Sequence, residues 1–362
     1  MSGTVGNNLE RASGSIGSAG SGITVDSGDP AIDTNPAGGV GTVWSNSTSG
    51  ETYVCTDASS GANVWTNVGD GGGQISLSFQ YAQVSGYAMT GYTGSNVDTI
   101  DKWSVTSDGN ATDVGNMSAI RDCGGYSSLT TGYQCGGYDG SRSNRIHRIT
   151  FASDGDSVDS SNLTVGRSGG CSGSQSATHG YWSGGTSTGA TDIIDKMQFS
   201  TNGDATDVGN LTSVMTDKSA GISSLTHSFN AGGTSHTTTI DKWAHASDGN
   251  ASATGTLSTA RGENQGQQDG THGYSSGSNN LPDKTKIDRF AFASDGTTSN
   301  IGDLTGSAKG NSFACSAASY GYNAGAFPTQ NIIDKYQFQA SSDSSDVGDL
   351  TLSRGAGASA QY

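Results

Sequence analysis

The chain is organised around the stretch IDKWSVTSDG (residues 100–109), which recurs in recognisable form five more times. The later copies begin at Ile146, Ile194, Ile240, Ile287 and Ile333, so the steps between copies are 46, 48, 46, 47 and 46 residues. A period this constant is typical of a stacked or circular repeat protein. The repeat therefore decides the architecture and must be interpreted before any single motif.

Each copy also carries two further markers at defined distances. An aromatic residue precedes the isoleucine by 11 or 13 positions, and an apolar residue always follows it by 17. Fixed distances indicate paired strands, whereas variable ones indicate loops. The aromatic residues are Tyr87, Tyr133, Tyr181, Phe229, Tyr274 and Tyr322. The apolar residues are Met117, Leu163, Leu211, Leu257, Leu304 and Leu350.

One repeat predicts four strands. They are a small-residue strand such as 221–226, an aromatic strand such as 133–137, the Ile-Asp-Lys strand and a fourth strand such as 112–117. The Ser-Asp-Gly-Asn sequence between the last two predicts a tight Asp-Gly hairpin. Four strands in about 47 residues form one propeller blade, and six copies predict six blades.

The C-terminal segment predicts how the ring closes. Residues 355–362 (GAGASAQY) have the register of another first strand. We expect this strand to complete the blade that contains Tyr87. The alternative is a seventh blade, made from the C-terminus and the strands of residues 41–68.

Composition and charge agree with an all-β chain and exclude some functions. The 362 residues include 57 glycines, only 31% are hydrophobic, and aspartate supplies almost all the acid of a formal net charge of −16. Glycine and aspartate favour turns. The negative charge argues against nucleic-acid binding. No apolar run is long enough to insert into a membrane, residues 1–22 do not predict a signal peptide, and the five cysteines predict free thiols in a reducing cytoplasm.

The sequence predicts three domains. Residues 1–37 are an extended Gly/Ser-rich arm for docking, 38–70 a small three-stranded β module with an aromatic cluster of Trp44, Tyr53 and Trp65, and 71–362 the propeller. Residues 41–57 read GTVWSNSTSGETYVCTD. This string resembles a small module of bacteriophage tail and fibre proteins. The resemblance implies a virion protein that is assembled in the host cytoplasm and docks to other virion proteins through residues 1–70.

The repeat itself resembles the kelch repeat. The matching features are the aromatic-x-x-Gly-Gly of residues 133–137, the hydrophobic-acid-x-aromatic of residues 100–103 and an arginine four residues past the apolar marker. That arginine is Arg121, Arg167, Arg261 and Arg354, while Met215 and Ala308 interrupt the series. The tryptophan of the fourth kelch strand is absent. The resemblance implies a kelch-like β-propeller, a fold that hosts many functions.

The polar residues of the repeat predict structure rather than catalysis. The aspartates of the motif are Asp101, Asp195, Asp241, Asp288 and Asp334, mostly followed by a basic residue such as Lys102. We expect partly buried Asp–Arg or Asp–Lys pairs within or between blades. We interpret His179, His227 and His272 as turn residues rather than metal ligands, and the Asp-rich turns as hairpins, with weak calcium binding left open. No catalytic constellation, cofactor or metal site is predicted.

Exposed aromatic residues are the candidate ligand contacts. Tyr92, Tyr138, Trp182 and Phe327 fall in the loops between the second and third strands, and aromatic rings beside polar turns suit sugar stacking. We therefore expect a tail-fibre-like or other surface-displayed adhesin that binds a host glycan or protein, as a homo-oligomer in the particle. The alternatives are a purely architectural capsid-decoration or fibre-linking protein, and a carbohydrate-active enzyme.

Overall fold

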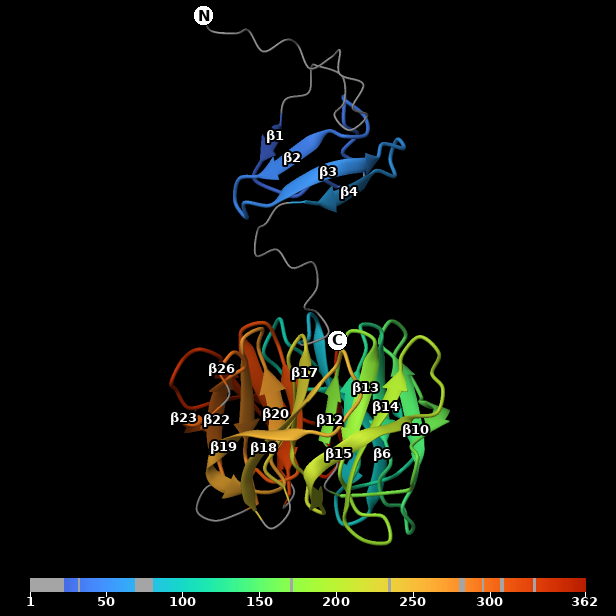
Figure 1. Ribbon diagram of the computed structural model, residues 1–362, viewed down its shortest axis with the longest axis vertical. Coiled ribbons are helices and arrows are strands. Elements are labelled where there is room, and N and C mark those ends of the chain that lie inside the picture. Colours follow the sequence, from blue (N-terminus) through green and yellow to red (C-terminus); the bar gives the residue numbers. More distant parts are fainter. Residues whose placement is uncertain are drawn as a thin grey trace, which may run out of the picture. The chain divides into compact units, whose positions relative to one another are not determined.

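The computed structural model describes residues 23–31, 33–68, 81–169, 172–233, 236–279, 284–294, 296–306, 309–327 and 330–362. These residues form 28 strands in seven four-stranded sheets, so the predicted all-β class is confirmed (Figure 1). None of them belongs to a helix that could cross a membrane. The chain divides into two compact units, residues 1–76 and 77–362.

The first unit is one sheet with four strands rather than the predicted three. Its strands, in order, are β1 (Thr24–Asp26), β2 (Val43–Asn46), β3 (Thr52–Asp57) and β4 (Val64–Asn67). The additional strand β1 comes from the predicted docking arm and pairs in parallel with β2. Trp44 and Trp65 meet edge to face at 6.0 Å, and Tyr53 lies opposite Trp44 in the register. The remainder of the arm, residues 1–22, lies outside the described residues, as does the Gly71–Gly73 joint.

The second unit contains the other six sheets, each antiparallel. The first is β28 (Ala358–Gln361), β5 (Ser85–Tyr92), β6 (Asn96–Ser104) and β7 (Thr112–Asn116). The second is β8 (Gly124–Ser127), β9 (Thr131–Cys135), β10 (Arg145–Thr150) and β11 (Val158–Asn162). The third is β12 (Ser172–Gln175), β13 (His179–Ser183), β14 (Thr191–Gln198) and β15 (Thr206–Met215). The fourth is β16 (Ala220–Ser223), β17 (His227–Ala231), β18 (Thr237–Ala244) and β19 (Ser252–Arg261). The fifth is β20 (Gln265–Gln268), β21 (His272–Ser276), β22 (Lys286–Ala291) and β23 (Ser299–Asp303). The sixth is β24 (Phe313–Ser316), β25 (Tyr320–Ala326), β26 (Gln330–Gln337) and β27 (Ser345–Asp349).

The C-terminal strand completes the first of these sheets. β28 pairs with β5, and Ala360 lies opposite Tyr87. The prediction that the C-terminus joins the sheet containing Tyr87 is confirmed. The strands of the alternative partner, residues 41–68, belong instead to the separate sheet of the first unit.

The first strand of each sheet touches the first strands of its two neighbours. These contacts run β28, β8, β12, β16, β20, β24 and back to β28. The approach is so close that side chains are excluded: a Cβ on Gly173 would lie 1.9 Å from the Gly125 carbonyl oxygen, and one on Gly266 would lie 2.0 Å from that of Gly221. This crowding explains why the second position of each first strand holds a small residue: Gly125, Gly173, Gly221, Gly266, Ala314 and Ser359.

A cycle of six hydrogen bonds joins the ends of these innermost strands. Serine and glutamine alternate around it, and each backbone N–H donates to the side chain of a neighbouring sheet. The backbone N–H of each glutamine donates to a serine hydroxyl: Gln361 to Ser127 (2.8 Å), Gln175 to Ser223 (2.8 Å) and Gln268 to Ser316 (2.9 Å). The backbone N–H of each serine donates to the side-chain oxygen Oε1 of a glutamine: Ser127 to Gln175 (3.4 Å), Ser223 to Gln268 (3.2 Å) and Ser316 to Gln361 (3.0 Å). The backbone N–H groups at the ends of these strands are thus paired across neighbouring sheets.

Apolar side chains pack between the sheets rather than in one central core. Six clusters of buried residues are present, and each draws on two neighbouring sheets. One of them joins the sixth sheet to the first, through Tyr322 and Ile333 on one side and Trp103 and Ala88 on the other. This arrangement is consistent with a β-propeller.

The strand directions define two ends of the second unit. Residues 82–85 bond to Ser316 and Tyr362, where the innermost strands finish, and we call this the proximal end. The connections between third and fourth strands also lie there. The opposite, distal end carries the loops between second and third strands and the segments that lead into each innermost strand. The chain therefore enters the second unit at its proximal end.

Candidate functional site: inter-sheet ion pairs and the distal face

The aspartate of each repeat motif is buried and holds the preceding sheet. Asp195 on β14 accepts hydrogen bonds from the backbone N–H (3.1 Å) and the hydroxyl (2.6 Å) of Thr164, which follows β11. Four more aspartates make the same pair of contacts. They are Asp101 with Thr351, Asp241 with Thr212, Asp288 with Ser258 and Asp334 with Thr305.

Four of these carboxylates also face a fully buried cation from the preceding sheet. The ion pairs are Arg354–Asp101 (2.9 Å), Arg167–Asp195 (2.6 Å), Arg261–Asp288 (2.8 Å) and Lys309–Asp334 (2.7 Å). Lys309 supplies the cation where the arginine series is interrupted. The predicted inter-sheet pairs are confirmed for these repeats, and their burial is complete rather than partial.

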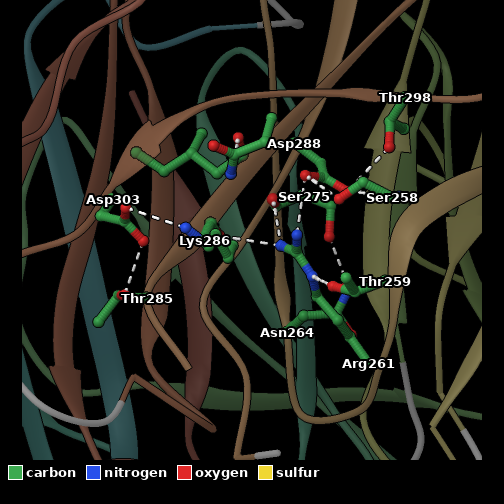
Figure 2. A network of polar contacts seen from close by, with 12 residues as sticks. Ser258, Thr259, Arg261, Asn264, Ser275, Thr285, Lys286, Asp288, Thr298 and Asp303 are labelled. Carbon is green, nitrogen blue, oxygen red and sulfur yellow. Dashed lines mark hydrogen bonds and ion pairs between the residues drawn. The ribbon is translucent and has the colours of Figure 1, made fainter. Parts of the chain in front are cut away.

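Figure 2 shows how one of these pairs is satisfied. The Arg261 guanidinium donates to the carbonyl oxygens of Ser275 (3.2 Å) and Lys286 (2.9 Å) as well as facing Asp288. Asp288 accepts in turn from the hydroxyls of Ser258 and Thr298, both at 2.8 Å. These contacts come from strands of both sheets, so the pair fastens the fourth sheet to the fifth.

Two repeats depart from this pattern. At the end of β15 in the third sheet, Met215 takes the place of the arginine, so among the described residues no cation faces Asp241 of the fourth sheet. Thr212 remains the hydrogen-bond partner of Asp241. Burial raises the pKa of Asp241 above its ordinary value. In the second sheet, His147 replaces the aspartate, and burial lowers its pKa.

The lysine after the motif aspartate does not pair with that aspartate but with an acid of the following sheet. Lys102 bonds to Asp154 (2.8 Å), Lys196 to Asp248 (2.6 Å) and Lys335 to Asp108 (2.7 Å). Each acid belongs to the Asp-Gly turn of the following sheet, and Lys335 reaches from the sixth sheet to the first.

The predicted hairpin between the third and fourth strands is present, because β6 pairs with β7 in antiparallel fashion. Its connection is longer than a tight Asp-Gly turn, since residues 105–111 separate the two strands. Among the described residues, no group of three or more His, Cys, Asp or Glu side chains could hold a metal ion.

Arg121 is the member of the arginine series that is not buried in an ion pair. The segment from Met117 to Tyr133 is one or two residues shorter than its counterparts. Consequently Ile120, not Arg121, takes the buried place next to the edge of the sheet. Arg121 is carried to the distal face, where its guanidinium lies between the rings of Tyr92 (4.8 Å) and Tyr138 (5.0 Å).

This Tyr92–Arg121–Tyr138 stack, which we call the platform, is partly exposed. Arg121 Nε donates to Asp122 and Nη1 donates to Asn96, each at 3.3 Å. Asn96 also donates to the Tyr138 carbonyl oxygen at 2.9 Å. These contacts fix the stack between the first and second sheets and present it to solvent.

The other two predicted aromatic contacts are placed differently. Trp182 is only 1% exposed: it lies within β13, not in a loop, and packs beside Gly136 and Arg167. Its assignment as a ligand contact is therefore wrong. Phe327 is 46% exposed and lies on the sixth sheet, beside Gly310. Its neighbour Pro328 lies outside the described residues.

A small polar cavity lies beside the platform at the distal mouth of the centre. It has a volume of about 200 Å³ and is lined by Asp122, Asp217, Lys218, Glu263 and Asn311 among others. Lys218, 7% exposed, donates to the Gly357 carbonyl oxygen (2.7 Å), which belongs to the opposite side of the cycle of sheets. Burial, reinforced by Asp217 and Asp122, raises the pKa of Glu263 to about 6. Lys218 thus closes this mouth to larger ligands.

The three histidines lie at the proximal end, at the start of second strands. The Nδ1 atoms of His179, His227 and His272 each lie 2.8 Å from the hydroxyl of the preceding threonine. Four cysteines, Cys55, Cys123, Cys135 and Cys315, are free and buried, while Cys171 lies outside the described residues. In comparisons with known proteins, the chain matches no protein-family model and no curated protein.

Proposed function

We propose that the chain is a structural protein of a bacteriophage particle that attaches to a glycan on the host surface. In this proposal, the six sheets of residues 77–362 are the blades of a closed, kelch-like propeller. The first unit docks to other virion proteins, as expected from the resemblance of residues 41–57 to tail and fibre modules. The propeller presents its distal face to the host.

The observation that carries the proposal is the position of the platform. Two tyrosines and an arginine are stacked in a partly exposed group at the distal end, whereas the polypeptide enters the unit at the proximal end. Exposed, preorganised aromatic rings bind sugars at low entropic cost. The charged residues of the repeat pair with one another inside the protein, so we assign them to the rigidity of the fold rather than to ligand binding.

Two alternatives differ in what they require of the distal face. A purely architectural decoration or linking protein needs no ligand there. A carbohydrate-active enzyme needs a pair of catalytic groups, but the described buried acids of the repeat are occupied by threonines and cations. The platform therefore favours attachment over both.

The test is binding of the purified full-length protein to host cells. Tyr138→Ala removes one face of the platform and is expected to weaken binding about two- to tenfold, as for the loss of one aromatic contact. The matched control is Tyr320→Ala, because Tyr320 is also stacked by a cation, Lys335 at 4.5 Å, but at the proximal end. Absence of binding to host cells, or absence of the protein from purified virions, contradicts the proposal.

A further inference from the structure

We propose that the platform recognises a carboxylate-bearing polysaccharide, with Arg121 and Arg142 holding the carboxylate and Tyr138 the sugar ring. This inference rests on the proposed function and specifies its ligand class. It is drawn from three observations on the second sheet: the backbone register around Tyr138, the uncommitted edge of Arg121, and the contrast with the neighbouring sheet.

The register places two arginines on either side of one tyrosine. Tyr138 forms a β-bridge with Arg121 on one side and with Arg142 on the other. Residues directly opposite each other in neighbouring strands project their side chains from the same face. Arg121, Tyr138 and Arg142 therefore form a row on the distal surface, and Arg142 is exposed.

The guanidinium of Arg121 is held in place by its neighbours, but some of its N–H donors are not used in hydrogen bonds. Its Nε and one N–H of Nη1 donate to Asp122 and Asn96, and its Cζ lies 4.8 Å and 5.0 Å from the ring centroids of Tyr92 and Tyr138. Among the described residues, none accepts a hydrogen bond from Nη2. The Nη1–Nη2 edge retains donors on both nitrogens, and such a planar fork matches the two oxygens of a carboxylate.

The neighbouring sheet has the same backbone without these side chains. There Thr186 takes the place of Tyr138 and forms bridges with Ser168 and Ala190. The fold does not require Arg, Tyr and Arg at these three positions, because Ser168, Thr186 and Ala190 occupy them in the third sheet with the same backbone bridges. The row carries two arginines, the first of which pairs with Asp122, in a chain of net charge −16. The nearby carboxylate of Asp139 is engaged by the backbone N–H and hydroxyl of Ser141, both within its own loop.

The inference is tested with the full-length protein and defined polymers. The probes are polygalacturonate, alginate and polysialic acid, the same polymers after methyl esterification of their carboxyls, neutral dextran and dextran sulfate. Binding to at least one carboxylate polymer is expected and is expected to disappear on esterification. Arg142→Gln and Arg121→Gln are each expected to weaken it about ten- to a hundredfold, as for one hydrogen-bonded charge. Arg142 is exposed, so its variant retains the fold.

The control variant is Lys286→Gln. Lys286 also lies at the distal end, immediately before the isoleucine of its repeat, and pairs with Asp303 at 3.2 Å, but it belongs to the fifth sheet. Unchanged binding by this variant is expected.

Several outcomes overturn the inference. Equal binding to esterified polymers or to dextran sulfate would refute carboxylate recognition, as would an equal effect of Lys286→Gln. Binding to host cells without binding to any carboxylate polymer would refute the inference and leave the proposed function standing. Failure to bind host cells at all contradicts the proposed function itself.

Discussion

At the residue scale, the buried aspartate of the repeat has opposite effects on stability depending on whether a cation faces it. Asp195 and Asp241 occupy the same place in their repeats and accept the same two hydrogen bonds from a threonine. Arg167 neutralises the first, whereas Met215 stands where a cation would face the second. A buried charge without a counter-charge is destabilising, and a buried pair is strongly destabilised by losing one member.

The two aspartates therefore predict opposite effects of one substitution. Asp195→Asn leaves Arg167 buried without its counter-charge and is expected to lower the free energy of unfolding by about 3–5 kcal/mol. Asp241→Asn removes an unpaired charge, can keep both threonine contacts, and is expected to be neutral or stabilising at pH 7. Urea unfolding at pH 7 measures both, and equal losses would contradict the ion-pair interpretation.

Glu263 predicts a pH dependence of stability. Its pKa rises from an ordinary 4.5 to about 6 in the folded protein, chiefly through burial. Between these values the folded state binds more protons than the unfolded state, so this group's contribution to stability falls as the pH rises through that window. Glu263→Gln is expected to raise the melting temperature at pH 7.5 and to leave it unchanged at pH 4.0. A rise of equal size at both pH values would show a cause other than ionisation.

At the element scale, β28 links the first sheet to the sixth. It supplies the innermost strand of the first sheet, and its Ser359 and Gln361 bond to the sixth sheet through Ala314 and Ser316. The sequence register indicated this role for residues 355–362. The length of the connections between third and fourth strands could not be predicted in the same way, because the Asp-Gly signal was used by a lysine of another sheet.

Removal of β28 is expected to unfold the second unit. A chain ending at residue 356 would expose the edge of β5 and leave Tyr87 and Met89 without Ala358 and Ala360, with which they cluster. Circular dichroism and size-exclusion chromatography would then show loss of compact β structure. The control is Gln361→Ala, which removes one bond of the serine–glutamine cycle and keeps the strand. A compact truncated chain would contradict the role of β28.

At the scale of the whole molecule, the two compact units make separate predictions. Among the described residues, the apolar clusters all belong to the second unit, and each sheet lies within one unit. A protease site inserted between Ser76 and Leu77, at the boundary of the units, is expected to release a second unit that keeps its melting temperature within a few degrees. Differential scanning calorimetry before and after cleavage checks this. A second unit that unfolds on release would show that the first unit contributes to its stability.

The sequence by itself determined the repeat, the four strands of each repeat, the partner of the C-terminal strand and the positions of the pairing aspartates and arginines. These features follow from spacing, because a strand repeats its inward and outward positions whatever surrounds it. The tertiary structure alone decided which partner each charge meets. Lys309 replaces a missing arginine, and Trp182 is buried by its approach to Gly136. A segment shortened by a residue or two carries Arg121 to the surface, because burial depends on three-dimensional packing that spacing along one strand does not contain.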